Sequence, residues 1–357
     1  MISYSGIGTY LQNLLPFITK EFKTILLGNK KEIEYYSIRP FKIININSRI
    51  YSICEHIELP LKIRRTDIYW SPHYVLPLLN IRSKVIVSTV HDINHVIFTK
   101  GIKRLYSKIM ISNALRKSEK IITVSNFSKG EMIKYFNVSE KKIVTIYNGI
   151  DRKLFQCSKN DQFLQKIKKK YKLPERFILY VGSVKPHKNL YRAVLAFMRL
   201  VKDYNDLYFI IIGKSDELIT SDKRVLDMIH NDNRIKNRVI LQGIIEKNIL
   251  PYFYKLSDLL LFPSLYEGFG LPPLEAMACG TPVVASKLSS ITEVCGDAAY
   301  YVDPYSEEDI AYGCHNVLSD NVLKSNLIKK GLQRVMKFDW WKSAEKHMKL
   351  FKSLLNE

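Results

Sequence analysis

The second half of the chain alternates short apolar runs with longer stretches in which apolar residues recur at helical spacing. The apolar runs predict strands over residues 177–182, 207–213, 238–243, 258–263, 282–286 and 299–303. Helices are predicted to start near Asn189, Ser221, Lys247, Pro272, Ser290 and Ser306. Strands that alternate with helices indicate an α/β fold with a parallel, doubly wound sheet, whose ligand crevice lies at the carboxyl ends of the strands.

The first half contains the same kinds of element at less regular spacing. One face of a predicted helix carries Leu11, Leu14, Leu15, Ile18 and Phe22. Strands are predicted over residues 24–27, 84–90 and 120–124, and a short strand begins at residue 67. Residues 102–117 form an amphipathic helix with a basic side, and residues 143–150, which contain an Asn-Gly turn, close the first half. No pattern organises the residues from about 28 to 66.

Length and composition indicate two globular domains. A chain of 357 residues is too long for one comfortable core. Its 46% hydrophobic and 25% charged residues are those of an ordinary globular protein. Residues 152–173 are charged and show no strand pattern, as expected of a linker and a surface helix. We therefore predict one domain over residues 1–155 and a second over residues 156–337.

The cysteines favour a reducing compartment. They are odd in number, scattered and without the spacing of metal ligands, at Cys54, Cys157, Cys279, Cys295 and Cys314. No apolar run approaches the roughly 20 residues of a membrane span, and the amino terminus has no basic and then apolar signal region. We predict a cytoplasmic location.

The net charge of +21 is compatible with nucleic acid, with an anionic membrane surface or with a general excess of lysine. The basic residues are spread along the chain and no nucleic-acid motif is present, so nucleic acid is not an expected partner. Solvated lysines and a patch that faces the inner leaflet both stay open. The basic side of the helix over residues 102–117 is a candidate for peripheral contact with anionic lipid.

The largest group of candidate ligand-binding residues follows the buried strand at 258–263. Gly268 and Gly270 allow backbone amides to approach a ligand, and the helix predicted directly after them points unpaired N–H groups into the same space. Glu267 and Glu275 repel phosphate but accept hydrogen bonds from hydroxyls. A nucleotide-sugar fits both requirements, whereas the structural alternative is a loop whose glutamates are solvated or favour the helix dipole.

Glu267 and Glu275, inside EGFGLPPLE, resemble the paired-glutamate signature of the GT-B retaining glycosyltransferases called group 1 or family 4. The resemblance implies a GT-B fold, in which two Rossmann-like domains face a central cleft. It implies that Glu267 faces the donor sugar, that Glu275 binds the ribose, and that the donor is held by Gly268, Phe269, Gly270 and Leu271. Residues 338–357 resemble the terminal helix that crosses back to the first domain.

A second motif follows the strand at 177–182. Lys188 arrives at the next helix start with an ammonium group suited to a diphosphate. In the resembled family a lysine here neutralises the leaving diphosphate, and an arginine commonly follows Gly182. Ser183 stands in place of that arginine, so the second charge is absent or comes from Lys185. Gly243 lies where relatives place the base and ribose.

A pair of glycines, Gly6 and Gly8, suggests a turn that opens a helix near the amino terminus. The resembled family has such a loop at the donor phosphate or the acceptor, after a strand for which this chain has no room. We therefore expect the first strand of the amino-terminal domain to be missing. A plain turn explains the glycines equally well, and a dinucleotide-binding fingerprint does not apply because the third glycine and its acidic partner are lacking.

Polar residues also follow the first-half strands. The strand at 84–90 delivers His91 to the ligand crevice, where an imidazole can donate to a substrate hydroxyl or leaving group. The resemblance implies that His91 contacts the donor sugar. Asp92 comes next, and the loop after the strand at residue 67 carries His73 and Tyr74; we name these three as possible acceptor-side residues. For His73, a structural role in the core stays open.

The expected reaction needs no metal site and no cofactor apart from the nucleoside-diphosphate sugar. The sequence has no Asp-x-Asp, so Lys188, the amides near Gly270 and the following helix are expected to neutralise the diphosphate. The resemblance implies retention of anomeric configuration, with the leaving phosphate taking the acceptor proton. Lys188, His91 and Glu267 are the predicted catalytic residues, and the last two orient the sugar.

We therefore expect a metal-independent retaining glycosyltransferase that builds surface polysaccharide or lipopolysaccharide from the cytoplasmic side of a membrane. The best single donor is GDP-mannose, on the likeness of GIGTY, HD and NGID to mannosyltransferase-like relatives. The acceptor is expected to be lipid-linked or a saccharide. The alternatives are a nucleotide-sugar epimerase of GT-B shape and an inactive, amino-terminally truncated binding protein.

Overall fold

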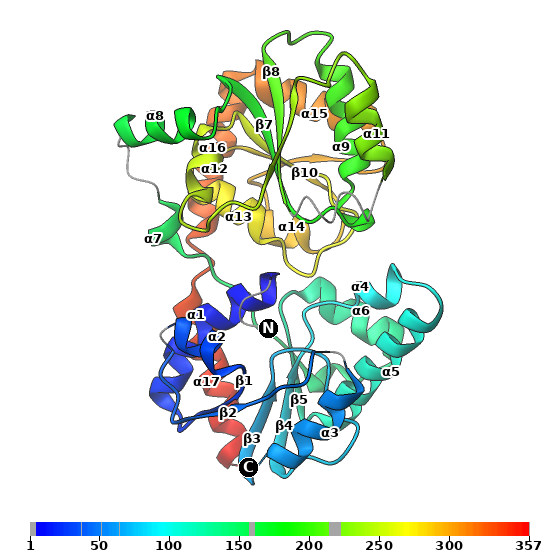
Figure 1. The fold of residues 1–357 in the computed structure, drawn as a ribbon, viewed down its shortest axis with the longest axis vertical. Helices are drawn as coiled ribbons and strands as arrows, with labels where there is room; N and C mark the ends of the chain where they lie inside the picture. The colour runs from blue at the N-terminus through cyan, green and yellow to red at the C-terminus, as the bar shows by residue number, and fades with distance from the viewer. Residues whose placement is uncertain are drawn as a thin grey trace. The chain divides into compact units, whose positions relative to one another are not determined.

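The computed structural model describes residues 5–36, 38–50, 52–63, 65–156, 161–213 and 223–356. The chain divides into two compact units (Figure 1). Unit 1 comprises Met1–Gly149 together with Phe338–Glu357, and unit 2 comprises Ile150–Lys337.

Among the described residues of unit 2, six parallel strands form one sheet in the order β12-β11-β10-β7-β8-β9. Their bounds are β7 Arg176–Val181, β8 Leu207–Ile212, β9 Val239–Gly243, β10 Leu259–Phe262, β11 Val283–Ser286 and β12 Tyr300–Val302. Every residue of β10 and β11 is buried, as expected of strands covered on both faces. Strand order reverses between β7 and β10, and the carboxyl ends of such a pair form a ligand site in open α/β sheets.

Helices cover both faces of this sheet (Figure 1). They are α7 Arg152–Phe155, α8 Asp161–Lys170, α9 Leu190–Leu200, α11 Lys223–Asn231, α12 Leu250–Leu256, α13 Leu271–Ala278, α14 Ser290–Cys295, α15 Glu307–Ser319 and α16 Asn321–Val335. Ile178 and Tyr180 of β7 pack with Phe197 of α9 and Val317 of α15 in one hydrophobic core. The helix start expected near Ser221 lies outside the described residues.

In unit 1 the described residues form a four-stranded parallel sheet in the order β3-β4-β5-β6 and a separate parallel pair, β1 and β2. The strands are β1 Ile25–Gly28, β2 Lys42–Asn45, β3 Thr66–Ser71, β4 Ser83–Thr89, β5 Lys120–Thr123 and β6 Ile143–Thr145. The helices are α1 Ser5–Glu21, α2 Lys30–Tyr35, α3 Ile53–Lys62, α4 Asn94–Ile97, α5 Gly101–Lys117, α6 Asn126–Phe136 and α17 Trp340–Asn356.

The last helix, α17, belongs to unit 1 and lies against α1. Tyr10 and Leu14 of α1 share one hydrophobic core with Trp340 and Phe351 of α17. Gly149 is required beside this helix, because a Cβ there would lie 2.2 Å from the backbone nitrogen of Trp340. The two stretches of chain that leave unit 1 therefore lie side by side on it.

The prediction of a glycine loop before the first helix is wrong. Gly6 and Gly8 lie within the first turns of α1, which begins at Ser5. The buried Tyr10, Leu11 and residues beyond them stabilise the helix through burial of its apolar face.

Along the chain, the boundary between the two units lies between Gly149 and Ile150. The sequence pattern predicted this boundary near residue 155. Phe155 is 2% exposed and its ring lies 6.1 Å from that of Tyr254, centre to centre. Its carbonyl accepts a hydrogen bond from Cys279 Sγ at 3.1 Å. These contacts attach α7 to the core of unit 2.

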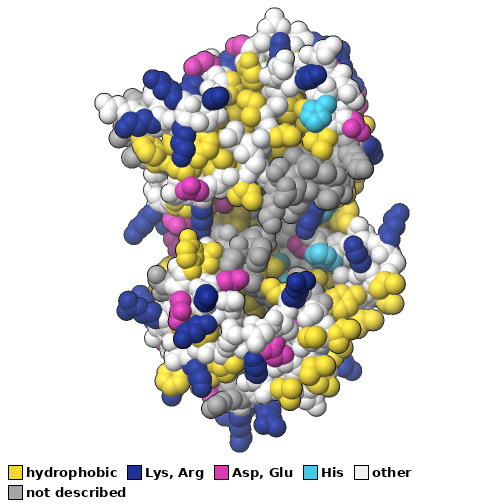
Figure 2. All heavy atoms as spheres, viewed as in Figure 1, with side chains coloured by type: hydrophobic (Ala, Val, Ile, Leu, Met, Phe, Trp, Pro, Cys, Tyr) yellow, Lys and Arg dark blue, Asp and Glu magenta, His cyan; other side chains and the backbone are white. Residues whose placement is uncertain are grey.

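Lys and Arg side chains are scattered over both units on the face shown in Figure 2. This agrees with a net charge of +21 spread along the chain. Within the described part of the chain, no helix combines the length and the apolar character that crossing a bilayer requires.

Candidate functional site

The segment after β7 is fixed by buried hydrogen bonds. Pro186–Lys188 form a short 3-10 helix, and Asn189 then adopts a left-handed conformation with φ 59° before α9 begins. The Asn189 side-chain amide donates to the carbonyls of Pro263 at 3.0 Å and Pro304 at 2.6 Å. The Tyr180 hydroxyl donates to the Lys188 carbonyl at 3.2 Å. The backbone of Lys188 is therefore held against the segment that follows β10.

Lys188 and Glu267 form a nearly buried ion pair. Lys188 Nζ lies 2.7 Å from each carboxylate oxygen of Glu267. The side chains are only 19% and 9% exposed. Lys188 Nζ also lies 5.8 Å from the centre of the Phe262 ring. Two of the three predicted catalytic residues are thus brought into direct contact, at the point where the strand order reverses.

Two serines that the sequence analysis did not identify as site residues hold the Glu267 loop. The Ser290 hydroxyl lies 2.9 Å from the Glu267 carbonyl and 3.0 Å from the Phe269 carbonyl, and donates its one hydrogen between them. The backbone N–H of Glu267 donates to Ser289 Oγ at 3.1 Å. Ser289 has φ 60° and ψ −151°, a region that residues other than glycine rarely occupy.

The predicted donor loop leads directly into α13. Gly270 has φ 99° and precedes the first residue of the helix, Leu271. A residue with a side chain would be strained at that φ. Phe269 is buried. At the start of α13, Pro272 and Pro273 carry no N–H, so the backbone donors without intrahelical partners are those of Gly270 and Leu271. These two amides and the positive end of the helix favour an anion.

Glu275 lies one turn into α13 and pairs with a tyrosine. The Tyr254 hydroxyl donates to Glu275 Oε2 at 2.8 Å. Burial raises the pKa of Glu275 to about 7, against the opposing effects of the Tyr254 hydrogen bond and the Lys247 charge. The carboxyl group therefore changes protonation near neutral pH.

Backbone hydrogen bonds join the glycines at the ends of the neighbouring strands. The N–H of Gly182 donates to the Ile212 carbonyl and that of Gly213 donates to the Gly243 carbonyl, both at 3.0 Å. A Cβ on Gly213 would lie 2.3 Å from the Gly182 oxygen. Ser183 is half-buried beside them, and Lys185 is exposed. Residues 214–215, which adjoin the expected base site, lie outside the described residues.

His91 follows β4 in unit 1. Its Nε2 lies 3.0 Å from the Pro72 carbonyl, which can only accept, so Nε2 carries the proton. Burial lowers the pKa of His91 to about 4, so the ring is neutral at pH 7. The expected donation to a substrate therefore needs correction: the one N–H of the neutral ring is engaged, and Nδ1 is an acceptor.

The acceptor-side candidates are mostly interior. His73 and Tyr74 are 4% and 5% exposed, and their ring centres are 4.0 Å apart. His73 Nδ1 accepts from the Val75 N–H at 3.2 Å, and burial lowers the pKa of His73 to about 3. This fits the structural role that the sequence left open. Asp92 is half-buried and its Oδ1 accepts from the Asn94 N–H at 2.9 Å.

A buried network that the sequence did not reveal lies beside His91. The Tyr10 hydroxyl lies 2.6 Å from Nε2 of His347 and 3.2 Å from the Thr89 hydroxyl. His347 Nδ1 lies 2.7 Å from the Ser343 carbonyl, so Nδ1 carries the proton and Nε2 accepts from Tyr10. The rings of Tyr10 and His91 meet edge to face at 4.9 Å. The network ties α1 and α17 to the end of β4.

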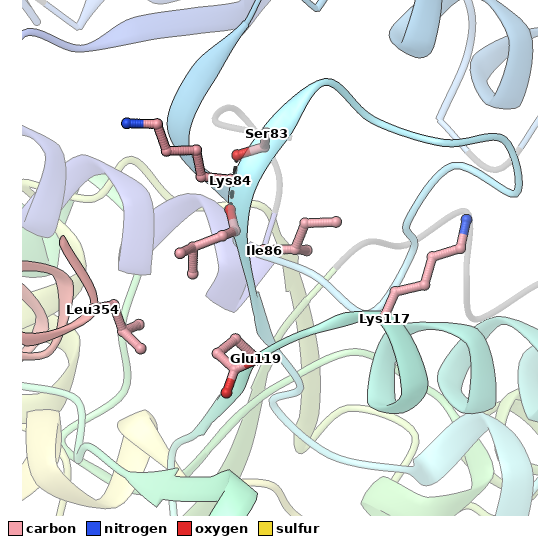
Figure 3. Close-up of a pocket in the computed structure, with 7 residues that line it drawn as sticks. Ser83, Lys84, Ile86, Lys117, Glu119 and Leu354 are labelled. Carbon is pink, nitrogen blue, oxygen red and sulfur yellow. Dashed lines mark hydrogen bonds between the residues drawn. The ribbon is translucent and has the colours of Figure 1, made fainter. Parts of the chain in front are cut away.

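A surface depression of about 260 Å³ lies at the amino end of β4, lined by residues that include Ser83, Lys84, Glu119 and Leu354 (Figure 3). It is at the opposite end of the strand from His91 and contains none of the predicted site residues. Among the described residues, no group of three or more His, Cys, Asp or Glu side chains is placed to hold a metal ion.

Comparison with known proteins gives two matching family models. "Glycosyl transferases group 1" matches residues 161–334, and "Glycosyltransferase Family 4" matches residues 5–154. The O-antigen chain mannosyltransferase RfbU of Salmonella typhimurium is 29% identical over 282 residues, 78% of this chain and 72% of that protein. The O-antigen chain mannosyltransferase B of Escherichia coli is 30% identical over 303 residues, 80% of this chain and 74% of that protein.

Among solved structures, Alr3699/HepE of Anabaena in complex with UDP and glucose aligns with a TM-score of 0.81 at 17% identity. The alignment covers 98% of this chain and 96% of that chain. It confirms the predicted fold class, GT-B with two Rossmann-like domains built on parallel sheets. The chain belongs to the group 1, or family 4, glycosyltransferases, and is a transferase.

Proposed function

We propose that the chain is a retaining, metal-independent hexosyltransferase that moves mannose from GDP-mannose to a lipid-linked or saccharide acceptor in surface polysaccharide synthesis. The choice of sugar and pathway is supported by the names of the two relatives, both O-antigen chain mannosyltransferases at about 30% identity. The observation that carries the site assignment is the Lys188–Glu267 ion pair between the ends of β7 and β10.

The ion pair gives a physical route for donor binding. Without donor, the Lys188 ammonium is neutralised by Glu267. A diphosphate placed at the first turn of α13 attracts the ammonium and repels the carboxylate. Lys188 then turns toward the diphosphate, and both oxygens of Glu267 become free to accept from sugar hydroxyls. Binding exchanges one pairing for another, so neither charge is left buried alone.

In the proposed reaction, the acceptor oxygen forms a bond to the anomeric carbon as the bond from that carbon to the diphosphate oxygen breaks. The acceptor proton passes to the departing phosphate on the same face of the sugar, which retains the configuration. Lys188 and the amides at the start of α13 stabilise the charge that develops on the diphosphate. This division of roles requires no protein nucleophile and no metal ion.

Four further residues complete the proposal. Glu275 accepts from the ribose hydroxyls, and Tyr254 orients its carboxylate through the 2.8 Å hydrogen bond. For His91 we keep the predicted role at the donor sugar, with the neutral ring accepting through Nδ1. Asp92 stays an acceptor-side candidate, because its side chain is not fully buried.

The test is transfer of labelled sugar from GDP-mannose and from UDP-glucose to lipid-linked and soluble saccharide acceptors, in the presence of EDTA. We expect transfer from GDP-mannose, insensitivity to EDTA, and retention of configuration by NMR of the product. Lys188→Met and Glu267→Gln are expected to lose at least about a hundredfold in kcat/KM.

Matched controls are the surface pair Lys330 and Asp297, whose nitrogen and oxygen lie 3.2 Å apart. Lys330→Met and Asp297→Asn should leave transfer unchanged. Full activity of both site variants would overturn the site assignment. Isomerised sugar without any acceptor would identify an epimerase instead, and no heat on titration with any nucleoside diphosphate would identify an inactive remnant.

A further inference from the structure

Unit 1 contains a buried chain of hydrogen bonds that joins its first and last helices to the end of β4. Tyr10 of α1, Thr89 of β4 and His347 of α17 are all fully buried, and all belong to this unit. The Tyr10 hydroxyl lies between the other two side chains, 3.2 Å from Thr89 Oγ1 and 2.6 Å from His347 Nε2. One phenol therefore connects three elements that are far apart in the sequence.

The direction of each hydrogen bond in the chain is fixed. The Ser343 carbonyl can only accept, so the ring N–H of His347 is on Nδ1, 2.7 Å from that oxygen. Burial lowers the pKa of His347 to about 4, so the ring is neutral at pH 7 and its Nε2 accepts from Tyr10. Because the Tyr10 hydroxyl uses its one hydrogen there, its oxygen accepts from the Thr89 hydroxyl. Thr89 Oγ1 accepts in turn from the Trp70 indole N–H at 3.0 Å.

Polar groups are not needed to fill this part of the core. Leu14, Trp340 and Phe351 pack around the chain in the same hydrophobic cluster as Tyr10. A buried hydroxyl and a buried imidazole are unfavourable unless each is hydrogen bonded, so the chain is stable only when all of its members are in place. What it adds to apolar packing is a fixed position for the hydroxyl end of the Tyr10 ring.

His91 packs against this fixed ring. The ring centres of Tyr10 and His91 are 4.9 Å apart, with an interplanar angle of 85°. His91 Nε2 lies 3.0 Å from the Pro72 carbonyl. A single hydrogen bond would let the imidazole swing about that contact, whereas a second contact with a fixed ring restricts the swing. The direction of Nδ1, on the other side of the imidazole, is set by both contacts.

We propose that Tyr10 and His347 are positioning residues, which hold the His91 ring in the orientation that presents Nδ1 to the donor sugar. The inference rests on the proposed function, in which His91 accepts from that sugar. His347 acts through Tyr10, and Tyr10 acts through its ring contact with His91. The last helix of the chain, α17, thereby takes part in the proposed transfer, in addition to its apolar packing on α1.

The first experiment is a double-mutant cycle on transfer from GDP-mannose. Tyr10→Phe keeps the ring and removes the hydroxyl, and His347→Leu removes the acceptor of that hydroxyl. Each should lower kcat/KM by about tenfold through misalignment of the sugar. The double variant should lose no more than either single variant, because both break the same chain. Affinity for GDP, which lacks the sugar, should not change. Losses that multiply in the double variant would overturn the proposal.

Two controls separate positioning from stability. His347→Gln carries a carboxamide oxygen that can accept from Tyr10, and should recover most of the transfer lost in His347→Leu. Ile18→Ala truncates a buried side chain of α1 in the same core, and should lower Tm while leaving kcat/KM unchanged. If Ile18→Ala loses as much transfer as Tyr10→Phe at equal stability, the chain of hydrogen bonds has only a structural role.

The second experiment needs no donor or acceptor. Proton–nitrogen correlation NMR of the histidine rings shows which ring nitrogen carries the proton. His91 should show Nε2–H and His347 should show Nδ1–H, with each assigned by its loss in His91→Asn or His347→Gln. In His347→Leu the His91 signals should shift or double, because Tyr10 is no longer fixed, and His347→Gln should return them to their place.

The two experiments fail separately. His91 signals that are the same in the unaltered chain and in His347→Leu would overturn the positioning role, whether or not the chain transfers sugar. If the His91 signals respond as expected but the unaltered chain transfers no sugar from GDP-mannose, the proposed function fails, and the coupling of His347 to His91 through Tyr10 stands.

Discussion

Both carboxylate oxygens of Glu267 lie 2.7 Å from the ammonium nitrogen of Lys188, although the residues are 79 positions apart in the sequence. The contact exists because β7 and β10 are neighbours in the sheet and both residues follow these strands. It brings a group suited to phosphate and a group suited to hydroxyls to one place. The ion pair therefore links stability to the proposed chemistry.

The first prediction concerns this pair. Lys188→Met leaves the Glu267 carboxylate nearly buried without its cation, and should lower the free energy of unfolding by about 3 kcal/mol. Glu267→Gln should cost a similar amount, whereas the double variant should cost less than the sum of the two. Urea unfolding of the full chain, followed for unit 2, gives the free energies of this double-mutant cycle. Strict additivity would show that the two side chains do not interact.

The second prediction concerns the strained serine. Ser289→Ala keeps the unfavourable φ and removes the acceptor of the Glu267 N–H, so it should destabilise the protein by about 1–2 kcal/mol. Ser289→Gly loses the same hydrogen bond but relieves the strain, and should stay close to the unaltered protein. Thermal unfolding decides the order. A glycine variant less stable than the alanine variant would contradict the inferred strain.

The third prediction concerns Ser290. Ser290→Ala leaves the Glu267 and Phe269 carbonyls without their shared donor, at a cost of about 1–2 kcal/mol. If the loop positions Glu267, KM for the donor should rise and Ser290→Thr should restore part of the loss. Loss of stability with unchanged donor KM would limit Ser290 to a structural role.

The fourth prediction follows from the raised pKa of Glu275. The unfolded carboxyl group loses its proton near pH 4.5, whereas the folded one keeps it to about pH 7. The unaltered chain should therefore lose stability relative to Glu275→Gln as pH rises from about 4.5 to 7, with a constant difference above that range. Denaturant unfolding across this range measures the difference, and parallel curves would contradict the raised pKa.

The fifth prediction uses donor binding to measure the pKa of Glu275. Tyr254→Phe removes a hydrogen bond that lowers the pKa of Glu275, so the pKa should rise further. If the carboxylate form of Glu275 binds ribose, donor affinity rises as Glu275 loses its proton. In Tyr254→Phe this rise should occur at a higher pH than in the unaltered chain. Calorimetric titration with GDP across pH 6 to 9 (roughly the range around the folded pKa) measures the shift. Affinity that does not change with pH would exclude Glu275 as the ribose ligand.

Sequence patterns predicted the strands of unit 2 well, because β10 and β11 are buried on both faces and read as continuous apolar runs. They did not organise residues 28–66, which contain α2, β2 and α3. In β2 the two end residues are exposed and the inner two are half-buried, so no clear alternation marks the strand. The exposed apolar stripe of α3 likewise faces solvent rather than a core.

The candidate site shows the same limit. Local motifs identified Lys188, Glu267 and Glu275 one by one, because each follows a strand or lies in a helix start. The contact between the first two depends on strand order, which the sequence did not specify. Ser289 carries no local signal of its unusual backbone. Tyr10 and His347 are 337 positions apart and meet only through the packing of α1 on α17.

The place of α17 in unit 1 has a consequence for how the chain matures. Unit 2 is continuous from Ile150 to Lys337, so all of its core has been synthesised before the ribosome reaches α17. The core of unit 1 is completed later, because Tyr10, Leu14 and Trp70 pack with residues of α17. Unit 2 can therefore be completed before unit 1, although unit 1 begins earlier in the chain.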